Sequence, residues 1–298
     1  MFAQAAFYAK ALHLVLDGRV ITPEIVRSDY DRLSPTYDDY FSRHVAKHSD
    51  HLLERMRISP GVRAADLACG TGAVTLQLAR QAGPAGHVIG IDASAGMIEQ
   101  ARRKASGLRN AAPVEFRIGH MQKKLEEIPD GSLDVVTCAW AIGYARPPEL
   151  VRTAAAKLRP GGKLGIIENR RSTLKPIRRT SIKVAASMPR SVRRIMDLHA
   201  RLPRSVRALQ GFAQAAGLTT KQAWEGDELF SFKSGEEVLD WVLHTGASAG
   251  FDRVMDESVR GLCDQRFIAV IERDYLRRGE IKVAHRYAAA IASRDAGR

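Results

Sequence analysis

The residues with the clearest chemical potential lie in Asp66-Leu-Ala-Cys-Gly-Thr-Gly72, a glycine-containing run that follows a short apolar stretch. Glycines at such a turn let the backbone approach a ligand at a point where a Cβ would collide. Twenty residues beyond Gly72, Asp92 ends a second apolar run. A carboxylate at that place can accept hydrogen bonds from both hydroxyls of a ribose. The two features predict a nucleoside cofactor across the carboxyl ends of two neighbouring strands.

The glycine run by itself leaves two kinds of nucleoside cofactor open. A dinucleotide fingerprint requires G-x-G-x-x-G, with the pyrophosphate at the N-terminus of the following helix. The aligned positions here are Ala68, Gly70 and Ala73, which is a poor match. A nicotinamide-dependent dehydrogenase is therefore the weakest of the enzyme hypotheses.

Short apolar runs alternate with helical patterns from Val62 onward. Strands are predicted at residues 64–68, 87–92, 114–118, 133–139 and 163–168, with helices at 74–81, 95–103 and 148–158. This alternation predicts right-handed crossovers and a doubly wound α/β fold. Two later strands, within 221–232 and near 281–291, complete a Rossmann-like, seven-stranded, mostly parallel sheet whose last strand is antiparallel.

Four stretches of different character divide the chain. Residues 1–60 are predicted as an N-terminal helical cap, 61–170 as the nucleoside-binding core, and 171–207 as a basic helical segment. Residues 208–298 complete the core and contain a helical insert at about 234–278. The insert region is rich in large apolar side chains, which would form a lid suited to a hydrophobic small molecule. These side chains are Phe230, Phe232, Leu239, Trp241, Val242, Leu243 and Phe251.

The chain is strongly basic. It has 46 Lys and Arg against 33 Asp and Glu, a net charge of +13, and residues 170–207 contain twelve of the basic residues and one acid. Such an excess predicts an acidic partner. Interleaved Ile, Val and Met favour an amphipathic helix on an anionic membrane surface, or an acidic protein. Nucleic acid ranks lower because the segment has no aromatic stacking run, and a solvated basic face is the alternative without a partner.

Several other classes of protein are disfavoured. Cys69, Cys138 and Cys263 are too few and too scattered for a disulfide framework, and we expect no metal. No stretch reaches the roughly 18 apolar residues that span a bilayer. Residues 1–16 lack a basic start, so they are predicted as an amphipathic helix and not as a signal peptide. A cytoplasmic location is predicted, with peripheral membrane contact as an option.

The motif set as a whole resembles that of class I S-adenosylmethionine (SAM)-dependent methyltransferases, and is most similar to the branch that includes the ubiquinone/menaquinone biosynthesis enzymes. Residues 66–72 resemble the family's D-x-G-x-G-x-G, with Ala68 in place of the first glycine. Asp92 corresponds to the ribose-binding acid. Further similarities are Ala93–Met97 to D-x-S-x-x-M, Ser132–Val136 to F-D-V-V, Leu158–Leu164 to L-x-P-G-G, and Tyr30-Asp31 and Tyr37-Asp38 to an N-terminal Y-D segment that folds over the cofactor.

The resemblance implies a role for each matching residue. Asp66, Gly70 and Gly72 would border the methionine part of SAM, Asp92 the ribose and Met97 the adenine. His120 stands where the family has an acid near the adenine amino group. The implied cofactor-binding residues are Tyr37, Asp66, Ala68, Gly70, Thr71, Gly72, Asp92, Ala93, Met97, His120, Met121, Cys138 and Ala139. The acceptor would contact Trp140, Tyr144, Tyr30 and Trp241, and the candidates for a general base are His44, His244 and Glu168.

The predicted function is methyl transfer from SAM to a small hydrophobic acceptor by in-line displacement, which releases S-adenosyl-L-homocysteine. The acceptor class is a lipid, a quinone precursor or an aromatic natural product. One alternative is a SAM-fold enzyme that catalyses another reaction. Others are a methyltransferase directed to RNA or an acidic protein through residues 170–207, and a non-enzymatic binding protein. The sequence specifies neither the acceptor atom nor the oligomeric state.

Overall fold

The computed structural model describes residues 2–39, 43–196, 201–245 and 253–296. The chain forms two compact units, each built from three segments. The core unit comprises Tyr30–Arg171, Arg201–Gly226 and Tyr287–Arg298. The helical unit comprises Met1–Asp29, Ser172–Ala200 and Asp227–Arg286. Both units are therefore assembled from parts of the chain that are far apart in sequence.

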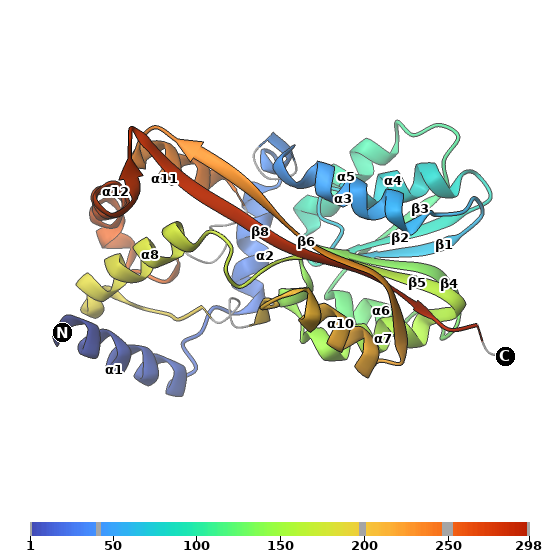
Figure 1. The fold of residues 1–298 in the computed structure, drawn as a ribbon, viewed down its shortest axis with the longest axis horizontal. Coiled ribbons are helices and arrows are strands. Elements are labelled where there is room, and N and C mark those ends of the chain that lie inside the picture. Colours follow the sequence, from blue (N-terminus) through green and yellow to red (C-terminus); the bar gives the residue numbers. More distant parts are fainter. Residues whose placement is uncertain (1, 40–42, 197–200, 246–252, 297–298) are drawn as a thin grey trace. The chain divides into compact units, whose positions relative to one another are not determined.

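A mostly parallel sheet has its parallel strands in the core unit, and its last strands also contain residues of the helical unit (Figure 1). Its strands are β1 (Arg63–Leu67), β2 (His87–Asp92), β3 (Val114–Ile118), β4 (Leu133–Ala139), β5 (Leu158–Asn169), β6 (Leu218–Phe232) and β8 (Glu280–Arg294). They lie in the order β3-β2-β1-β4-β5-β8-β6, and β7 (Leu276–Arg277) pairs with β8. Strands β1 to β5 run parallel, and β8 runs antiparallel to β5. The predicted doubly wound sheet with an antiparallel last strand is confirmed.

Helices cover both faces of this sheet (Figure 1). Helices α3 (Arg43–Met56), α4 (Ala73–Ala82) and α5 (Ala95–Ala105) lie on one face, and α6 (Met121–Glu126), α7 (Pro147–Lys157) and α10 (Val206–Ala215) lie on the other. A parallel sheet buried on both faces needs apolar side chains on both sides of each strand. This is why the central strands read as continuous apolar runs in the sequence.

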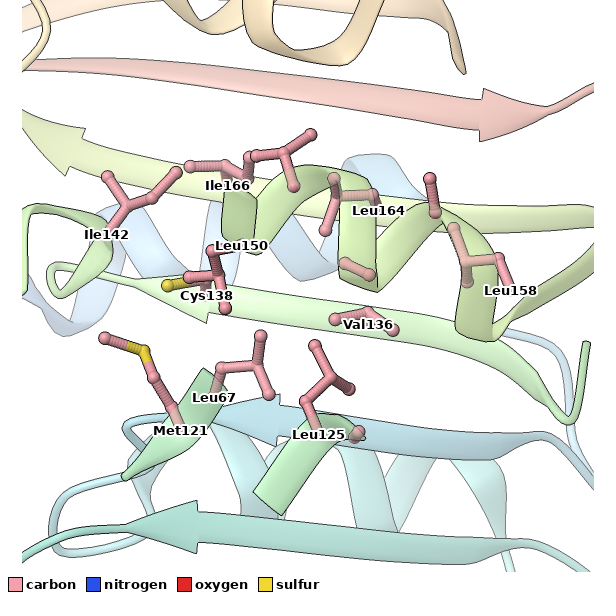
Figure 2. Close-up of a cluster of buried hydrophobic side chains, with 14 of the residues drawn as sticks. Leu67, Met121, Leu125, Val136, Cys138, Ile142, Leu150, Leu158, Leu164 and Ile166 are labelled. Atoms are coloured by element: carbon pink, nitrogen blue, oxygen red, sulfur yellow. The ribbon is translucent and has the colours of Figure 1, made fainter. Parts of the chain in front are cut away.

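The larger apolar core lies between the sheet and α6, α7 and α10. Figure 2 shows Leu67 of β1 and Val136 of β4 close to Leu125 of α6, with Leu150 of α7 packed beyond them. Met121 and Cys138 belong to the same cluster and are buried. A second cluster on the opposite face includes Leu52, Leu53 and Met56 of α3 with Val74 and Leu78 of α4.

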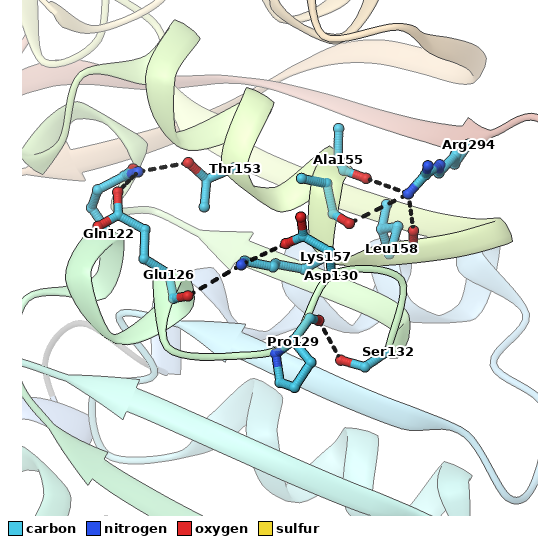
Figure 3. Close-up of polar contacts among 11 residues, drawn as sticks. Gln122, Glu126, Pro129, Asp130, Ser132, Thr153, Ala155, Lys157, Leu158 and Arg294 are labelled. Atoms are coloured by element: carbon cyan, nitrogen blue, oxygen red, sulfur yellow. Dashed lines mark hydrogen bonds and ion pairs between the residues drawn. The ribbon is translucent and has the colours of Figure 1, made fainter.

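Polar contacts fix the end of the sheet opposite the glycine turn (Figure 3). The ammonium of Lys157 donates to the backbone oxygen of Glu126 at 3.1 Å and pairs with Asp130 at 2.7 Å. The guanidinium of Arg294 donates to the backbone oxygen of Leu158 at 2.7 Å. These bonds join α6 and α7 to the start of β5 and the end of β8.

Two local predictions differ from the structure. Strand β5 begins at Leu158, earlier than the strand predicted at residues 163–168; its pairing with β4 shifts register between Leu133 and Val135, and Gly161 has a φ of +80°. The glycine makes this irregularity possible because it tolerates a positive φ. The short helix α6 had not been predicted, since six residues are too few to show a helical period.

The helical unit has its own apolar core. Its helices are α1 (Phe2–Leu16), most of α2 (Pro23–Leu33), α8 (Lys175–Ser187), α11 (Gly235–His244) and α12 (Arg260–Tyr275), with short turns η3 (Pro189–Ser191) and η6 (Glu257–Val259). Val238 and Ile271 of α11 and α12 pack with Ile177 and Val184 of α8. In the described part of the basic segment, regular helix covers Lys175–Ser187 and begins again at Val206, and the described part of the insert contains α11, η6 and α12.

Among the described residues, no helix combines the length and the apolar character needed to cross a bilayer. The same residues contain no cluster of three or more His, Cys, Asp or Glu side chains placed to hold a metal ion.

Candidate cofactor and active site

The turn between β1 and α4 has the backbone conformation that glycines favour. Ala68, Gly70 and Gly72 have φ values of +54°, +54° and +89°. A Cβ on Gly72 would meet the Cβ of Ala101 at 3.0 Å, so this glycine allows α4 and α5 to pack closely. A Cβ on Gly70 would meet nothing within 4 Å. The turn therefore presents open space beside Gly70, where a ligand can approach the backbone.

The carboxylate of Asp92 joins the turn after β1 to the turn after β2. Its Oδ2 accepts a hydrogen bond from the amide of Gly70 at 2.8 Å, and its Oδ1 accepts one from the amide of Ser94 at 2.8 Å. Burial raises the pKa of Asp92, whereas the amides of Ser94, Gly70 and Ala93 act in the opposite direction. Each carboxylate oxygen has a second acceptor position, which suits a pair of ribose hydroxyls.

The carboxylate of Asp66 is buried and hydrogen-bonded within the core unit. It accepts hydrogen bonds from the hydroxyls of Thr75 at 2.6 Å and Thr137 at 2.8 Å. Burial raises its pKa to about 6, against the effect of these two hydroxyls. The side chain thus ties β1 to α4 and β4. These two threonine contacts had not been predicted, because a single threonine within an apolar helix or strand does not change the sequence pattern.

The other residues implied in cofactor binding lie near the carboxyl ends of the parallel strands. Met97 is buried in the first turn of α5, and its amide donates to the hydroxyl of Ser94 at 3.0 Å. Met121 and Cys138 point into the core (Figure 2). Ala93 follows β2 directly, and Ala139 is the half-buried last residue of β4.

His120 takes the N-cap position of α6, next to the candidate site. It is half-buried, and its side chain caps no amide of the helix. Burial lowers its pKa, and the charge of Lys123 acts in the same direction. A neutral imidazole can donate through one ring nitrogen and accept through the other, so it can replace an acid as a hydrogen-bond acceptor.

Two aspartates of the N-terminal segment bind the turns that carry Gly70 and Asp92. Asp31 accepts hydrogen bonds from the Ser94 hydroxyl at 2.6 Å and the Gly96 amide at 3.0 Å. Asp38 accepts a hydrogen bond from the hydroxyl of Thr71 at 2.6 Å and pairs with Lys104. The motif similarity predicted contacts for Tyr37 and Tyr30, whereas the hydrogen bonds of Asp31 and Asp38 to the two turns had not been predicted.

Three tyrosines gather beside these turns. The hydroxyls of Tyr30 and Tyr144 are 2.7 Å apart, and the ring of Tyr30 packs edge-on against Tyr37 and Tyr144 with centroids 5.9 and 6.0 Å apart. Burial raises the pKa of Tyr144 to about 12, and the charges of Glu168 and Asp92 add to the rise. Both carboxylates therefore lie within electrostatic reach of this ring cluster.

Glu168 is a buried carboxyl group near the end of β5. Its Oε1 accepts a hydrogen bond from the amide of Asn169 at 2.7 Å, and its Oε2 accepts one from the amide of Gly143 at 3.3 Å. Burial raises its pKa to about 7, although these amides favour the charged form. A carboxyl group with a pKa near neutrality at the edge of a site can exchange protons efficiently.

Trp140 turns the chain after β4. It has a φ of +62°, and its backbone amide donates to the oxygen of Ile167 at 2.7 Å. Its indole nitrogen donates to the hydroxyl of Ser49 at 2.9 Å, and its ring packs against Tyr287 with centroids 5.8 Å apart. These contacts hold Trp140 against α3 and β8. Its role as an acceptor-binding residue stays a prediction.

Three further candidates are His44, Trp241 and His244. The side chain of His44 lies outside the described residues, as does Phe251. His244 ends α11 in the helical unit and pairs with Asp240 at 3.2 Å. Trp241 packs against Phe230 in the same unit, with ring centroids 5.2 Å apart. Among the general-base candidates whose side chains the structure describes, Glu168 lies in the core unit and His244 in the helical unit.

The chain is similar to known methyltransferases in sequence. Residues 64–162 match a family model described as "Methyltransferase domain". The chain is 31% identical over 150 residues to a demethylmenaquinone methyltransferase of Symbiobacterium thermophilum, which covers 49% of this chain and 59% of that protein. A demethylmenaquinone methyltransferase of Listeria welshimeri is 30% identical over 153 residues, covering 49% of this chain and 62% of that protein.

Solved structures share the fold. The YcgJ protein from Bacillus subtilis has a TM-score of 0.55 at 17% identity, and the match covers 84% of this chain and all of that one (100%). Geranyl diphosphate C-methyltransferase from Streptomyces coelicolor, solved with S-adenosyl-L-homocysteine, has a TM-score of 0.50 at 16% identity, covering 85% of this chain and 80% of that one. Residues 64–162 thus match the methyltransferase domain that the sequence motifs predicted, and the chain spans less than two thirds of the length of these two relatives.

Proposed function

We propose that this chain is a methyltransferase that transfers the methyl group of SAM to a small, largely apolar acceptor by in-line displacement. The observation that carries the proposal is the Asp92 carboxylate, which gathers the amides of Gly70 and Ser94 at the carboxyl ends of β1 and β2. Open space beside Gly70 and the two acceptor oxygens of Asp92 fit an adenosine.

The chain's own residues need to position two reactants and remove a proton. SAM supplies a methyl group on a sulfonium sulfur, which is already activated for transfer. The protein must hold the acceptor atom in line at about 3–3.5 Å and exclude water. The packed rings of Tyr30, Tyr37 and Tyr144 support this role, because their ring faces are apolar and their hydroxyls can hydrogen-bond an acceptor.

Glu168 is the residue we assign as proton acceptor. In its ionised form its carboxylate takes the proton from an acceptor hydroxyl or amine as the new bond to carbon forms. Its pKa of about 7 lies near the value at which a general base combines sufficient basicity with sufficient ionisation at neutral pH. The nearby hydroxyls of Tyr144 and Tyr30 orient the acceptor by hydrogen bonding.

The acceptor class is supported by the relatives, whose name states that they methylate demethylmenaquinone. A quinone precursor, a lipid or an aromatic natural product fits an apolar site with few polar groups. The test is incubation of the chain with SAM and members of these three classes, with S-adenosyl-L-homocysteine and methylated product measured by mass spectrometry. SAM binding without product from any class would contradict the acceptor assignment, and no SAM binding would contradict the whole proposal.

Replacing Gly70 by alanine tests whether the open space beside the turn holds the cofactor. The free energy of unfolding should fall by only about 1 kcal/mol, because alanine is strained at a positive φ. SAM affinity should fall at least about tenfold, since the new Cβ enters the space that the ligand occupies. Thermal unfolding and calorimetric titration measure the two effects.

Gly131→Ala is the matched control for this prediction. Gly131 has a φ of +66°, and a Cβ there would meet nothing within 4 Å. It differs from Gly70 in position, because it precedes the amino end of β4 and lies away from the carboxyl ends of the strands. This variant should lose similar stability and keep the native SAM affinity. If Gly70→Ala also keeps that affinity, the cofactor does not lie against the turn.

A further inference from the structure

Helix α1 of the helical unit has two different apolar faces. Leu14 is fully buried and packs with Ala185 of α8 and Val192, and Phe7 packs against the same cluster. On the other side, four large apolar side chains are exposed at spacings of four, seven and eight residues, which places them on one face of the helix. They are Tyr8 (59% exposed), Leu12 (62%), Val15 (50%) and Leu16 (76%).

This exposed row is unlike the scattered apolar residues of an ordinary surface. Single exposed apolar side chains are normal, but a contiguous apolar face marks a contact surface. The buried face of α1 already anchors the helix, so the exposed row is not needed for that packing. The row therefore requires a partner that accepts apolar side chains.

The neighbouring elements identify the chemistry of that partner. Helix α1 packs against α8 and η3 within the helical unit (Figure 1). The exposed side chains of α8 follow the same spacing and are Lys175, Arg179, Ile182, Lys183 and Ser187. Arg190 of η3 is also exposed. Lys183 pairs with Asp274 at 2.6 Å, whereas Lys175, Arg179 and Arg190 have no ion pair with any part of the chain that the structure describes.

We propose that α1 and α8 form a docking surface for an anionic phospholipid bilayer, with the apolar row of α1 inserted at the level of the headgroups and the cations of α8 and η3 bound to lipid phosphates. A basic helix beside an apolar helix face is the combination that holds peripheral proteins on anionic membranes. Nucleic acid or an acidic protein would use the cations and leave the apolar row without a function. This surface is independent of the methyltransferase assignment.

The test is cosedimentation of the full chain with vesicles of phosphatidylglycerol and phosphatidylcholine, compared with vesicles of phosphatidylcholine alone. The native chain should bind the anionic vesicles and should dissociate as salt is added. Leu12→Gln with Leu16→Gln keeps the charge and should weaken binding at least about tenfold. Lys175→Gln with Arg179→Gln should weaken it about 25-fold, at about fivefold for each cation.

The matched control is Arg80→Gln with Arg103→Gln, which removes two exposed cations from α4 and α5 of the core unit. It should leave vesicle binding within about twofold of native if the docking surface is local. The proposal is overturned if the control weakens binding as much as the α8 variant, or if the α1 variant binds like the native chain. Equal affinity for single-stranded RNA in the native and α1 chains, without vesicle binding, would assign the cations to nucleic acid and also overturn it.

Discussion

Asp92→Ala is expected to raise the dissociation constant for SAM by at least about 100-fold, because two hydrogen bonds to a charged group contribute about 3 kcal/mol or more together. The carboxylate also holds the amides of Gly70 and Ser94, so its loss removes ligand contacts and disorganises the turn. Asp92→Asn keeps the shape and one acceptor oxygen, and we expect an intermediate loss. Calorimetric titration with SAM and with S-adenosyl-L-homocysteine measures both.

Asp134→Asn is the matched control for Asp92. Its carboxylate also accepts a hydrogen bond from a backbone amide, that of Arg63 at 2.7 Å, and pairs with Arg159. It lies near the start of β4, at the other end of the sheet from Asp92. SAM affinity should be native in this variant even if stability falls. A native SAM affinity in folded Asp92→Ala would remove the basis of the proposed function.

Glu168→Gln is expected to change how stability depends on pH. The pKa of Glu168 is about 7 in the folded chain and 4.5 without burial. Between these values the folded state binds a proton that the unfolded state does not, so native stability falls as pH rises through this window. The shift corresponds to about 3 kcal/mol. Glutamine cannot ionise, so the variant should lose this contribution to the pH dependence.

Denaturant unfolding of both chains at several pH values across this window measures the difference. The absolute stability of Glu168→Gln should fall, because its amide group faces the N–H groups of Asn169 or Gly143. Glu149→Gln, at the exposed start of α7, is the control and should follow the native pH dependence. Parallel pH dependence in the native chain and Glu168→Gln would show that Glu168 is ionised throughout.

The same variant tests the catalytic assignment once an acceptor is found. Native turnover should rise with pH as Glu168 ionises around pH 7 and then level off. Glu168→Gln should reduce turnover by about 100-fold or more, within the usual contribution of a general base, while SAM affinity stays native. Unchanged turnover would assign proton removal to another group or to solvent.

Much of the core unit follows from local pattern. The runs at Val114–Ile118 and Leu133–Ala139 were predicted with the bounds that the structure has, because buried parallel strands are continuous apolar runs between turns. The start of β5 was not predicted, because Pro160 and Gly161 are residues typical of a turn. The irregular pairing of this part of β5 depends on the neighbouring strand β4. The formation of helix α6 depends on its packing against the sheet, and its six residues are too few to show a helical period in the sequence.

The sequence by itself determined the doubly wound fold, the glycine turn and the acid after β2, because strand period, glycine conformation and spacing along the chain are local properties. Only the tertiary structure decided that Asp66 bonds Thr75 and Thr137, that Asp31 and Asp38 fasten the N-terminal segment, and that Glu168 is buried. Apart from Thr75, nine residues from Asp66, the bonded partners are 33 or more residues apart in sequence. Packing between elements decides which amide or hydroxyl each carboxylate contacts and how much water it loses. The local sequence pattern does not contain this information.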